Sequence, residues 1–505
     1  MRRVYDLPLI VILMGVSALA MYIPAVHALS LRDLGVARAF FYSATVLLIL
    51  TTMVAIATAN HVPRNATHSH LRALMAAYLL LPLMLAVPFV QAVPDTSFLN
   101  ATFEMVSSFT TTGATLYDTP GRLPPSVHLW RAVVGWFGGY FVLLTAAAIL
   151  APLNLGGFEV LSPRSAGRSN LSFGQITRLA DPSARILHHA KLLFPIYAGL
   201  TIALWVGLLL AGDPSLVALT HAMAVISTSG ISPVNGLSGA SSGIAGEALL
   251  FLGMMFAVTR RSMPGAPRID AQSSLQRDPE VRLALFFCTT VPLALFLRHW
   301  IGAIEVAPPE SLMSGTQALW GSVFTVLSFL TTTGFESEGW LDARQWSGLE
   351  TPGLILLGLA MMGGGVATTA GGVKLFRVYA LYRLGRREMD KLSEPSSVAG
   401  GGPVARQLRQ EGAYIAFIFF MLFALTLGAM NAALALAGIG FEKGVVLSVA
   451  SLTTTGPLAN VASDAVSGFG GLNAAAKVIL ALGMVLGRLE TLALLAVLAP
   501  AAWRR

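Results

Sequence analysis

Four short segments of threonine, serine and glycine carry the chemistry that this sequence suggests. They read TTTGAT from Thr110, STSGIS from Ser227, TTTGFE from Thr331 and TTTGPL from Thr453. A dehydrated monovalent cation needs a cage of carbonyl oxygens, and an extended Thr-x-Gly strand can supply one because glycine adopts torsions that other residues resist. We therefore expect the ion to be bound by Thr111, Thr112, Gly113, Thr228, Ser229, Gly230, Thr332, Thr333, Gly334, Thr454, Thr455 and Gly456.

Clusters of these small residues also serve in tight helix packing or in interfacial turns. For any single segment, that interpretation is the commoner one. Here, however, each of the four segments ends a stretch of about a dozen residues, which is too short to cross a bilayer. Four such segments at matching positions predict four re-entrant pore loops around one axis.

The composition places these loops in a membrane. The chain has 55% hydrophobic and 11% charged residues, and its mean hydropathy is +0.70, which is typical of a protein with several membrane spans. The single cysteine, Cys288, excludes an internal disulfide and any multi-cysteine metal site. The sequence contains no dinucleotide-binding fingerprint and no catalytic triad. We therefore expect neither an organic cofactor nor enzymatic activity.

Windows of about 20 apolar residues predict ten membrane spans, with both termini on one side. The span from Gly243 to Val258 is the shortest. The ten spans lie near Leu7 to Leu29, Ala39 to Ala59, Ala73 to Val93, Trp130 to Leu150, Leu192 to Ala211, Gly243 to Val258, Leu283 to Trp300, Gly353 to Leu384, Tyr414 to Ala437 and Val478 to Leu498.

The distribution of charge orients these spans, because lysine and arginine near span ends are retained on the cytoplasmic side. With both termini inside, most of the 33 lysines and arginines fall at the termini or in inner loops, among them Arg260, Arg261 and Arg377. The opposite loops are acidic. The net charge of +8 therefore indicates topology, and no nucleic-acid partner is expected.

This orientation places all four Thr/Ser-Gly segments toward the outside, each between an outgoing and a returning span. The expected fold class is an all-α polytopic membrane protein, with four pseudo-symmetric helix, pore loop, helix repeats around one ion pore. An N-terminal helix pair precedes the repeats. The expected divisions are 1–66 for the pair, and 67–165, 166–270, 271–395 and 396–505 for the four repeats.

Each repeat is expected to contain a short pore helix with an acid at its outer end. The helices lie near Ser97 to Phe109, Ser215 to Ile226, Ser311 to Leu330 and Gly444 to Leu452, and the acids are Asp95, Asp213, Glu310 and Glu442. A carboxylate there would cap the helix N-terminus, while the negative C-terminal end points inward. Four converging negative ends favour a cation.

The apolar block from Gly353 to Leu384 is too long for one straight crossing, and five glycines break it in the middle. A broken helix at membrane depth predicts a hinge or a plug, although small residues also permit tight helix packing. A nucleotide-binding P-loop is excluded, because the run from Gly365 to Lys374 lacks the Gly-Lys-Ser/Thr ending.

Three charged residues stand out within apolar stretches. Arg488 and Glu490 fall inside the last span, where charges usually face a water-filled path or a partner. A structural pair between these two is the alternative. Glu104, in the first pore helix, either adds negative field near the outer mouth or bonds backbone amides.

Four stretches of the chain resemble the Trk/Ktr/HKT superfamily of potassium transporters, and within it the bacterial TrkH branch, over essentially the whole length. They are FEMVSSFTTTGAT from Phe103, WFGGYFVLLTAAAILAP from Trp136, MMGGGVATTAGGVKLFR from Met361 and MVLGRLETL from Met484. The last two are the most specific. The chain departs from the family at Ser229, where a glycine is more frequent, and at TTTGPL, where many relatives carry Asn-Asn-Leu-Gly.

The resemblance implies potassium uptake across the bacterial inner membrane, with both termini in the cytoplasm. It also implies an intramembrane gate loop below the filter, with Arg488 near the ion path. The residues that this assigns to the gate are Gly363, Gly364, Gly365, Thr368, Thr369, Gly371, Gly372, Lys374 and Arg488. The implied partners are a second copy of the chain and a cytosolic, TrkA-like nucleotide-binding subunit.

Three other functions remain to be weighed. A polytopic membrane enzyme would cluster histidines or acids near a span end, whereas the acids here are dispersed. A secondary transporter of another solute would be built on inverted repeats, whereas these repeats are parallel. A sodium-permeable relative is the nearest variant, because Ser229 alters one filter segment.

Overall fold

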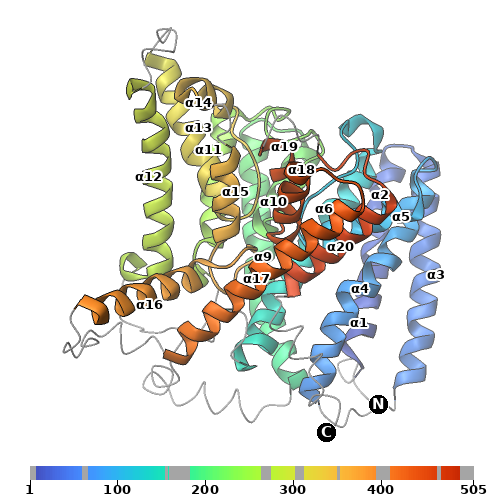
Figure 1. Ribbon diagram of the computed structural model, residues 1–505. Coiled ribbons are helices and arrows are strands. Elements are labelled where there is room, and N and C mark those ends of the chain that lie inside the picture. Colours follow the sequence, from blue (N-terminus) through green and yellow to red (C-terminus); the bar gives the residue numbers. More distant parts are fainter. Residues whose placement is uncertain are drawn as a thin grey trace.

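The computed structural model describes residues 7–59, 66–153, 157, 182–262, 275–301, 312–349, 353–393, 410–462 and 468–489. Within these ranges the chain is helical and has no β-strand, which confirms the expected all-α class. Figure 1 shows long helices standing side by side, with shorter helices enclosed among them. The short helices carry the loops of interest.

Among the described residues, seven helical segments are long and apolar enough to cross a membrane. They match seven of the ten expected spans. The segments are α1 with α2 (Leu9–Ala20 and Tyr22–Ser30), α3 (Leu34–Thr58), α4 (Ala66–Ala92), α6 with its extension η3 (Pro125–Thr145 and Ala146–Leu150), α9 (Pro182–Leu210), α12 (Pro279–Ile301) and α17 (Gln410–Leu436).

The other three expected spans are not matched by long helices within the described residues. Helix α11 covers Gly243–Met254, and α20 covers Ala474–Leu489, beyond which the expected span leaves the described residues. The block from Gly353 to Leu384 is not one span: α15 ends at Met362 and α16 begins at Leu375. Helix α16 (Leu375–Ser393) is rich in arginine, which disfavours a membrane core, and it runs across the foot of α12 (Figure 1).

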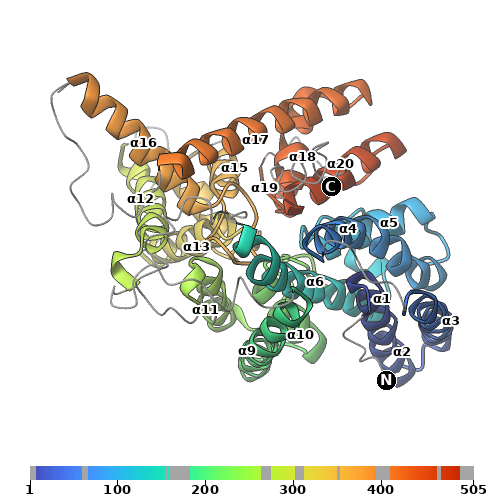
Figure 2. The ribbon, with the colours of Figure 1, turned by 90° about the horizontal axis from the view of Figure 1, so that it is seen from below.

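Each Thr/Ser-Gly segment follows a short helix at the position that the sequence predicts. These pore helices are α5 (Phe98–Phe109), α10 (Ser215–Ser227), α13 (Leu312–Leu330) and α18 (Phe441–Leu452). Each packs between the helices before and after it, in the groups α4–α5–α6, α9–α10–α11, α12–α13–α15 and α17–α18–α20. Seen from below, these four groups follow one another around the molecule (Figure 2). The expected divisions near 165, 270 and 395 lie outside the described residues.

Two of the four acids expected to cap the pore helices bind other partners. Ser97 caps α5 by accepting a 3.2 Å hydrogen bond from the Asn100 amide, whereas Asp95 pairs with Arg122 at 2.9 Å. Asp213 accepts hydrogen bonds from two backbone amides that lead into α11. Glu442 lies within the first turn of α18, and Glu310 falls outside the described residues. The capping expectation is therefore wrong for Asp95 and Asp213, whose carboxylates bind Arg122 and the backbone amides before α11 instead.

Candidate ion pathway

The four Thr/Ser-Gly segments share one backbone geometry. The second residue of each takes a left-handed conformation, with φ of 54° at Thr111, 52° at Thr228, 58° at Thr332 and 53° at Thr454. This torsion is unusual for a β-branched residue. In each loop the backbone amide of the following residue donates a hydrogen bond to a carbonyl of the pore helix. In the first loop the Thr112 amide donates to the Ser107 carbonyl at 2.8 Å. The repetition of a strained torsion at four equivalent sites indicates a shared functional constraint.

Hydroxyl groups brace each loop in the same way. In the first loop Thr110 donates to the Val106 carbonyl at 2.7 Å and lies 2.8 Å from the Thr112 hydroxyl. The corresponding hydroxyl pairs elsewhere are Ser227 with Ser229, Thr331 with Thr333, and Thr453 with Thr455, at 3.0 to 3.2 Å. Ser229 thus fills the position of a threonine in the other loops. All of these residues are buried.

The loops meet in sequence order and close into a ring. A side chain at Gly113 would reach within 1.8 Å of the Ser229 carbonyl oxygen, and one at Gly230 within 2.2 Å of the Thr333 carbonyl oxygen. A Cβ at Gly334 would lie 3.0 Å from the ring of Pro457 in the fourth loop. The fourth loop returns to the first, since the Gly456 amide donates to the Thr112 carbonyl at 2.6 Å. One lone pair of that carbonyl is therefore already used.

The fourth loop departs from the other three. Gly113, Gly230 and Gly334 have positive φ, whereas Gly456 does not, so the expectation of a glycine-only torsion at all four is wrong there. Pro457 follows directly, and a short helix, α19 (Leu458–Val461), replaces the extended strand. Proline fixes φ near −65° and favours the first turn of a helix, which accounts for the change.

Polar residues at matching positions of three pore helices hold the strand beyond each of the first three Thr/Ser-Gly segments, which are named filter loops after their expected role. Glu104 accepts from the Leu116 amide at 2.6 Å and from the Thr115 hydroxyl at 3.0 Å, and it pairs with Arg131 at 2.9 Å. His221 contacts Ser232 at 2.9 Å. In the third loop the Ser337 amide donates to Thr325. Of the two roles considered for Glu104, the bond to a backbone amide is thus present.

The segment between α15 and α16 forms a loop directly against the filter loops. It runs from Gly363 to Lys374, so the break lies where the five glycines predict one and has the bounds that the family resemblance implied. Gly363 and Gly372 both have a φ of 74° and lie so close together that a Cβ on Gly372 would be 2.7 Å from Gly363 Cα. The Gly371 amide donates to the Thr332 hydroxyl at 2.7 Å, and Thr369 donates to the Ile226 carbonyl at 3.3 Å.

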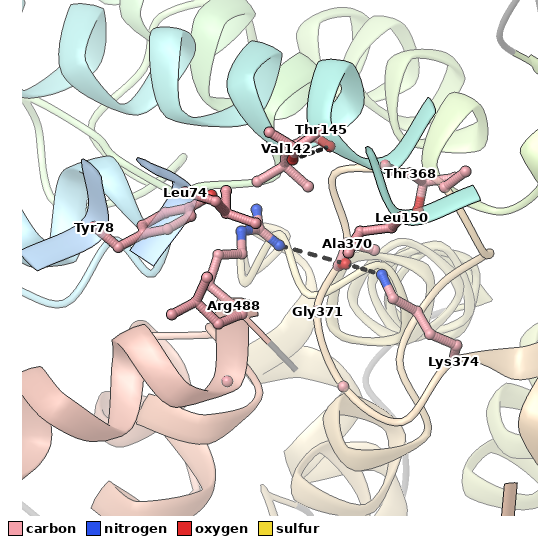
Figure 3. Close-up of a pocket in the computed structure, with 15 residues that line it drawn as sticks. Leu74, Tyr78, Val142, Thr145, Leu150, Thr368, Ala370, Gly371, Lys374 and Arg488 are labelled. Carbon is pink, nitrogen blue, oxygen red and sulfur yellow. Dashed lines mark hydrogen bonds between the residues drawn. The ribbon is translucent and has the colours of Figure 1, made fainter. Parts of the chain in front are cut away.

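Two buried cations hold this loop at its tip. Arg488 donates to the Ala370 carbonyl at 3.5 Å, and the Lys374 ammonium donates to the same oxygen from the other side (Figure 3). Arg488 also donates to the Thr111 hydroxyl of the first filter loop. These groups border a cavity of about 40 Å³, which has room for about three water molecules. Glu490, the alternative partner of Arg488, lies outside the described residues.

Comparisons with known proteins agree with this architecture. The family model of TrkH, described as a cation transport protein, matches residues 249–503. The chain is 30% identical over 427 residues to the Trk system potassium uptake protein TrkH of Salmonella typhimurium, covering 83% of this chain and 82% of that one. The chain belongs to the TrkH family.

Two further comparisons extend over almost the full length. The TrkH protein of Escherichia coli strain K12 is 29% identical over 492 residues, or 96% of each chain. The crystal structure of the potassium transporter TrkH from Vibrio parahaemolyticus superposes with a TM-score of 0.79 at 25% identity, covering all of both chains. The TrkH-family fold therefore accounts for the whole chain.

A buried cluster of charges in this TrkH-family chain was missed by sequence reasoning. The Glu280 carboxylate accepts a hydrogen bond from the backbone amide of Val366, in the loop between α15 and α16, at 2.8 Å and pairs with Arg260 at 3.2 Å. Asp278 pairs with Arg261 at 2.9 Å. Arg260 is 1% exposed, a burial that its place in a predicted inner loop did not indicate. In the sequence, this cluster is indicated only by the position of its charged residues next to the ends of predicted spans.

One acid lies immediately beyond the filter. Glu336 follows Gly334 by two residues and precedes the short helix α14 (Trp340–Ser347). Burial raises the pKa of its carboxyl to about 6, and the nearby Arg344 opposes that shift. Glu336 therefore changes charge near pH 6.

Proposed function

We propose that this chain is the potassium-translocating subunit of a Trk-type uptake system. The proposal is carried by one observation: four loops, each with a threonine in the left-handed conformation at its second position, meet in a ring, and the Gly363–Lys374 loop packs against it. Membership of the TrkH family, and the names of the potassium uptake proteins that the chain resembles, support potassium as the ion.

The proposed selectivity filter consists of the residues from Thr111 to Gly113 and their counterparts in the other three loops. Their carbonyl and hydroxyl oxygens would replace the hydration shell of the ion. The four pore helices end at these loops, and a helix C-terminus carries about half a negative charge, which favours a cation there. The fourth loop would present its oxygens to the ion in a different arrangement, because Gly456 and Pro457 depart from the common backbone geometry.

The proposed gate is the loop from Gly363 to Lys374. It contacts the filter through Gly371, and its tip is held by two cations, Arg488 and Lys374. Positive charge in a poorly hydrated passage repels a potassium ion, so this arrangement would impede flow. Opening would require the loop to leave the Thr332 hydroxyl and the Ala370 carbonyl to leave its cations.

The remaining parts of the proposal concern setting and partners. The excess of arginine and lysine in one set of loops supports an orientation in the inner membrane with both termini in the cytoplasm. A homodimer and a cytosolic, TrkA-like nucleotide-binding subunit are proposed from the family resemblance alone. Potassium is the transported ion, with no organic cofactor in this chain.

Isotope flux tests the proposal. Purified protein in proteoliposomes is expected to take up rubidium, a potassium analogue, and unlabelled potassium is expected to compete better than sodium. Expression in a host that lacks potassium uptake should restore growth at low potassium. Equal competition by sodium would favour the alternative function that Ser229 suggests, a sodium-permeable transporter. The absence of any cation flux would refute the proposal.

A further inference from the structure

Glu247, on α11, is a buried acid with an unusual set of partners. It is 3% exposed, and its carboxylate accepts three hydrogen bonds from the third repeat. These come from the Trp320 indole at 2.7 Å, the Ser337 hydroxyl at 2.8 Å and the Glu338 amide at 2.7 Å. A helix of the second repeat thus holds the strand that follows the third filter loop.

The strand held in this way leads directly from the filter. Ser337 is three residues beyond Gly334, so at about 3.5 Å per residue its backbone lies within roughly 11 Å of the filter glycine. Ser337 is fixed from the other side as well, because its amide donates to Thr325 of the pore helix at 3.3 Å. Glu247 therefore sets the position of the outer end of the third loop.

The charge of Glu247 distinguishes it from Glu104, which holds the first loop in a similar way. Glu104 is neutralised by Arg131 at 2.9 Å. No lysine or arginine in the described part of the chain forms an ion pair with Glu247. Its negative charge is felt nearby, since burial first and the Glu247 charge second raise the pKa of the exposed Glu338 carboxyl. A buried charge acts over a longer range than a solvated one.

We propose that Glu247 is a positioning residue of the outer filter mouth, whose unneutralised charge raises the affinity for external potassium. This deepens the proposed function and rests on it. A unit charge at about 12 Å, acting through an effective dielectric constant of about 20, changes cation affinity roughly tenfold. The effect should fall on the KM for the ion more than on the maximal rate.

The test compares the loss of the charge with the loss of single hydrogen bonds. Glu247→Gln keeps the size of the side chain and one acceptor oxygen. We expect it to raise the KM for rubidium uptake in proteoliposomes between three- and tenfold, with the maximal rate within twofold. Trp320→Phe and Ser337→Ala each remove one bond and keep the charge, and their KM should stay within twofold of the parent. If either reproduces the Glu247→Gln result, or if that result is absent, the proposal is wrong.

A second pair of variants tests the same charge without touching the carboxylate. Glu338 contributes only its backbone amide to Glu247 and is exposed, so its side chain can be changed with little effect on folding. Glu338→Lys places an ammonium group nearby and should raise the KM more than Glu338→Gln does. Equal KM values for the two would overturn the proposal even if Glu247→Gln failed to accumulate. A parent protein without rubidium uptake would instead refute the proposed function.

Discussion

The backbone amide of Gly371 donates a 2.7 Å hydrogen bond to the hydroxyl of Thr332. This bond joins the loop between α15 and α16 to the third Thr/Ser-Gly segment, so the proposed gate and the proposed filter are in direct contact. Thr332 is one of the four threonines held in the left-handed conformation. That torsion helps to place its hydroxyl where the loop can reach it.

Removal of this hydroxyl should loosen the gate loop. Thr332→Val keeps the side-chain shape and the backbone carbonyl, and a net hydrogen bond is worth about 1 kcal/mol. We expect basal rubidium efflux to rise roughly fivefold, with the preference for potassium over sodium unchanged. The measurement is isotope efflux from proteoliposomes with no regulatory subunit present. A loss of selectivity at unchanged basal flux would show that the Thr332 hydroxyl serves ion discrimination and does not restrain the loop.

A side chain at Gly113 should damage ion discrimination. In Gly113→Ser the new Cβ would lie 1.8 Å from the Ser229 carbonyl, on a backbone with a φ of 72°, so the ring must widen. We expect discrimination between potassium and sodium to fall about tenfold, which corresponds to about 1.4 kcal/mol. Competition of sodium against rubidium uptake measures it. Gly199→Ser is the matched control, because nothing lies within 4 Å of its new Cβ.

Removal of the Lys374 charge should ease ion passage through the closed loop. Lys374→Met keeps the length of the side chain but neither repels a cation nor holds the Ala370 carbonyl. We expect basal flux to rise about tenfold. The control is Lys477→Met, which removes a lysine that bonds Asn100 away from the loop. Equal effects of the two variants would indicate a general electrostatic change and would argue against a local gate.

The buried charges around Glu280 should matter for stability as well as for gating. Glu280→Gln leaves the fully buried Arg260 without one of its partners and weakens the bond to Val366. Breaking such a pair costs about 3 kcal/mol. We expect a lower melting temperature in detergent. Arg282→Gln, two residues away and exposed, should stay within about 0.5 kcal/mol of the parent. If Glu280→Gln melts at the same temperature as the parent protein, the cluster does not stabilise the fold.

External pH should modulate uptake through Glu336. With a pKa of about 6, this carboxyl loses its negative charge as the pH falls below that value, so cations are attracted less strongly to the outer mouth. We expect rubidium uptake at subsaturating concentration to decline between about pH 7 and about pH 5. Glu336→Gln, which has no charge to lose, should show a flatter profile, while the control Asp342→Asn should retain the decline. Identical profiles for the parent and Glu336→Gln would assign the pH effect elsewhere.

Much of the fold could be predicted from the sequence because the signals are local. A run of apolar residues long enough to cross a bilayer needs no knowledge of its neighbours, and α3, α9 and α17 lie where such runs occur. The break between Met362 and Leu375 could be predicted for the same reason, since consecutive glycines disfavour a helix whatever surrounds them. The four Thr/Ser-Gly segments and their pore helices belong to this class as well.

The contacts that hold the site were decided only by tertiary structure. Glu280 reaches Val366 across 86 positions of sequence, and Arg488 reaches Thr111 across 377, so neither pairing leaves a local pattern. The acids before the pore helices show the converse: their position suggests caps, yet Asp95 and Asp213 bind partners brought near by folding. The composition of a segment and the period of its hydrophobic residues determine whether it becomes a helix. The closest available partner determines what a buried charge does, and only packing supplies that partner.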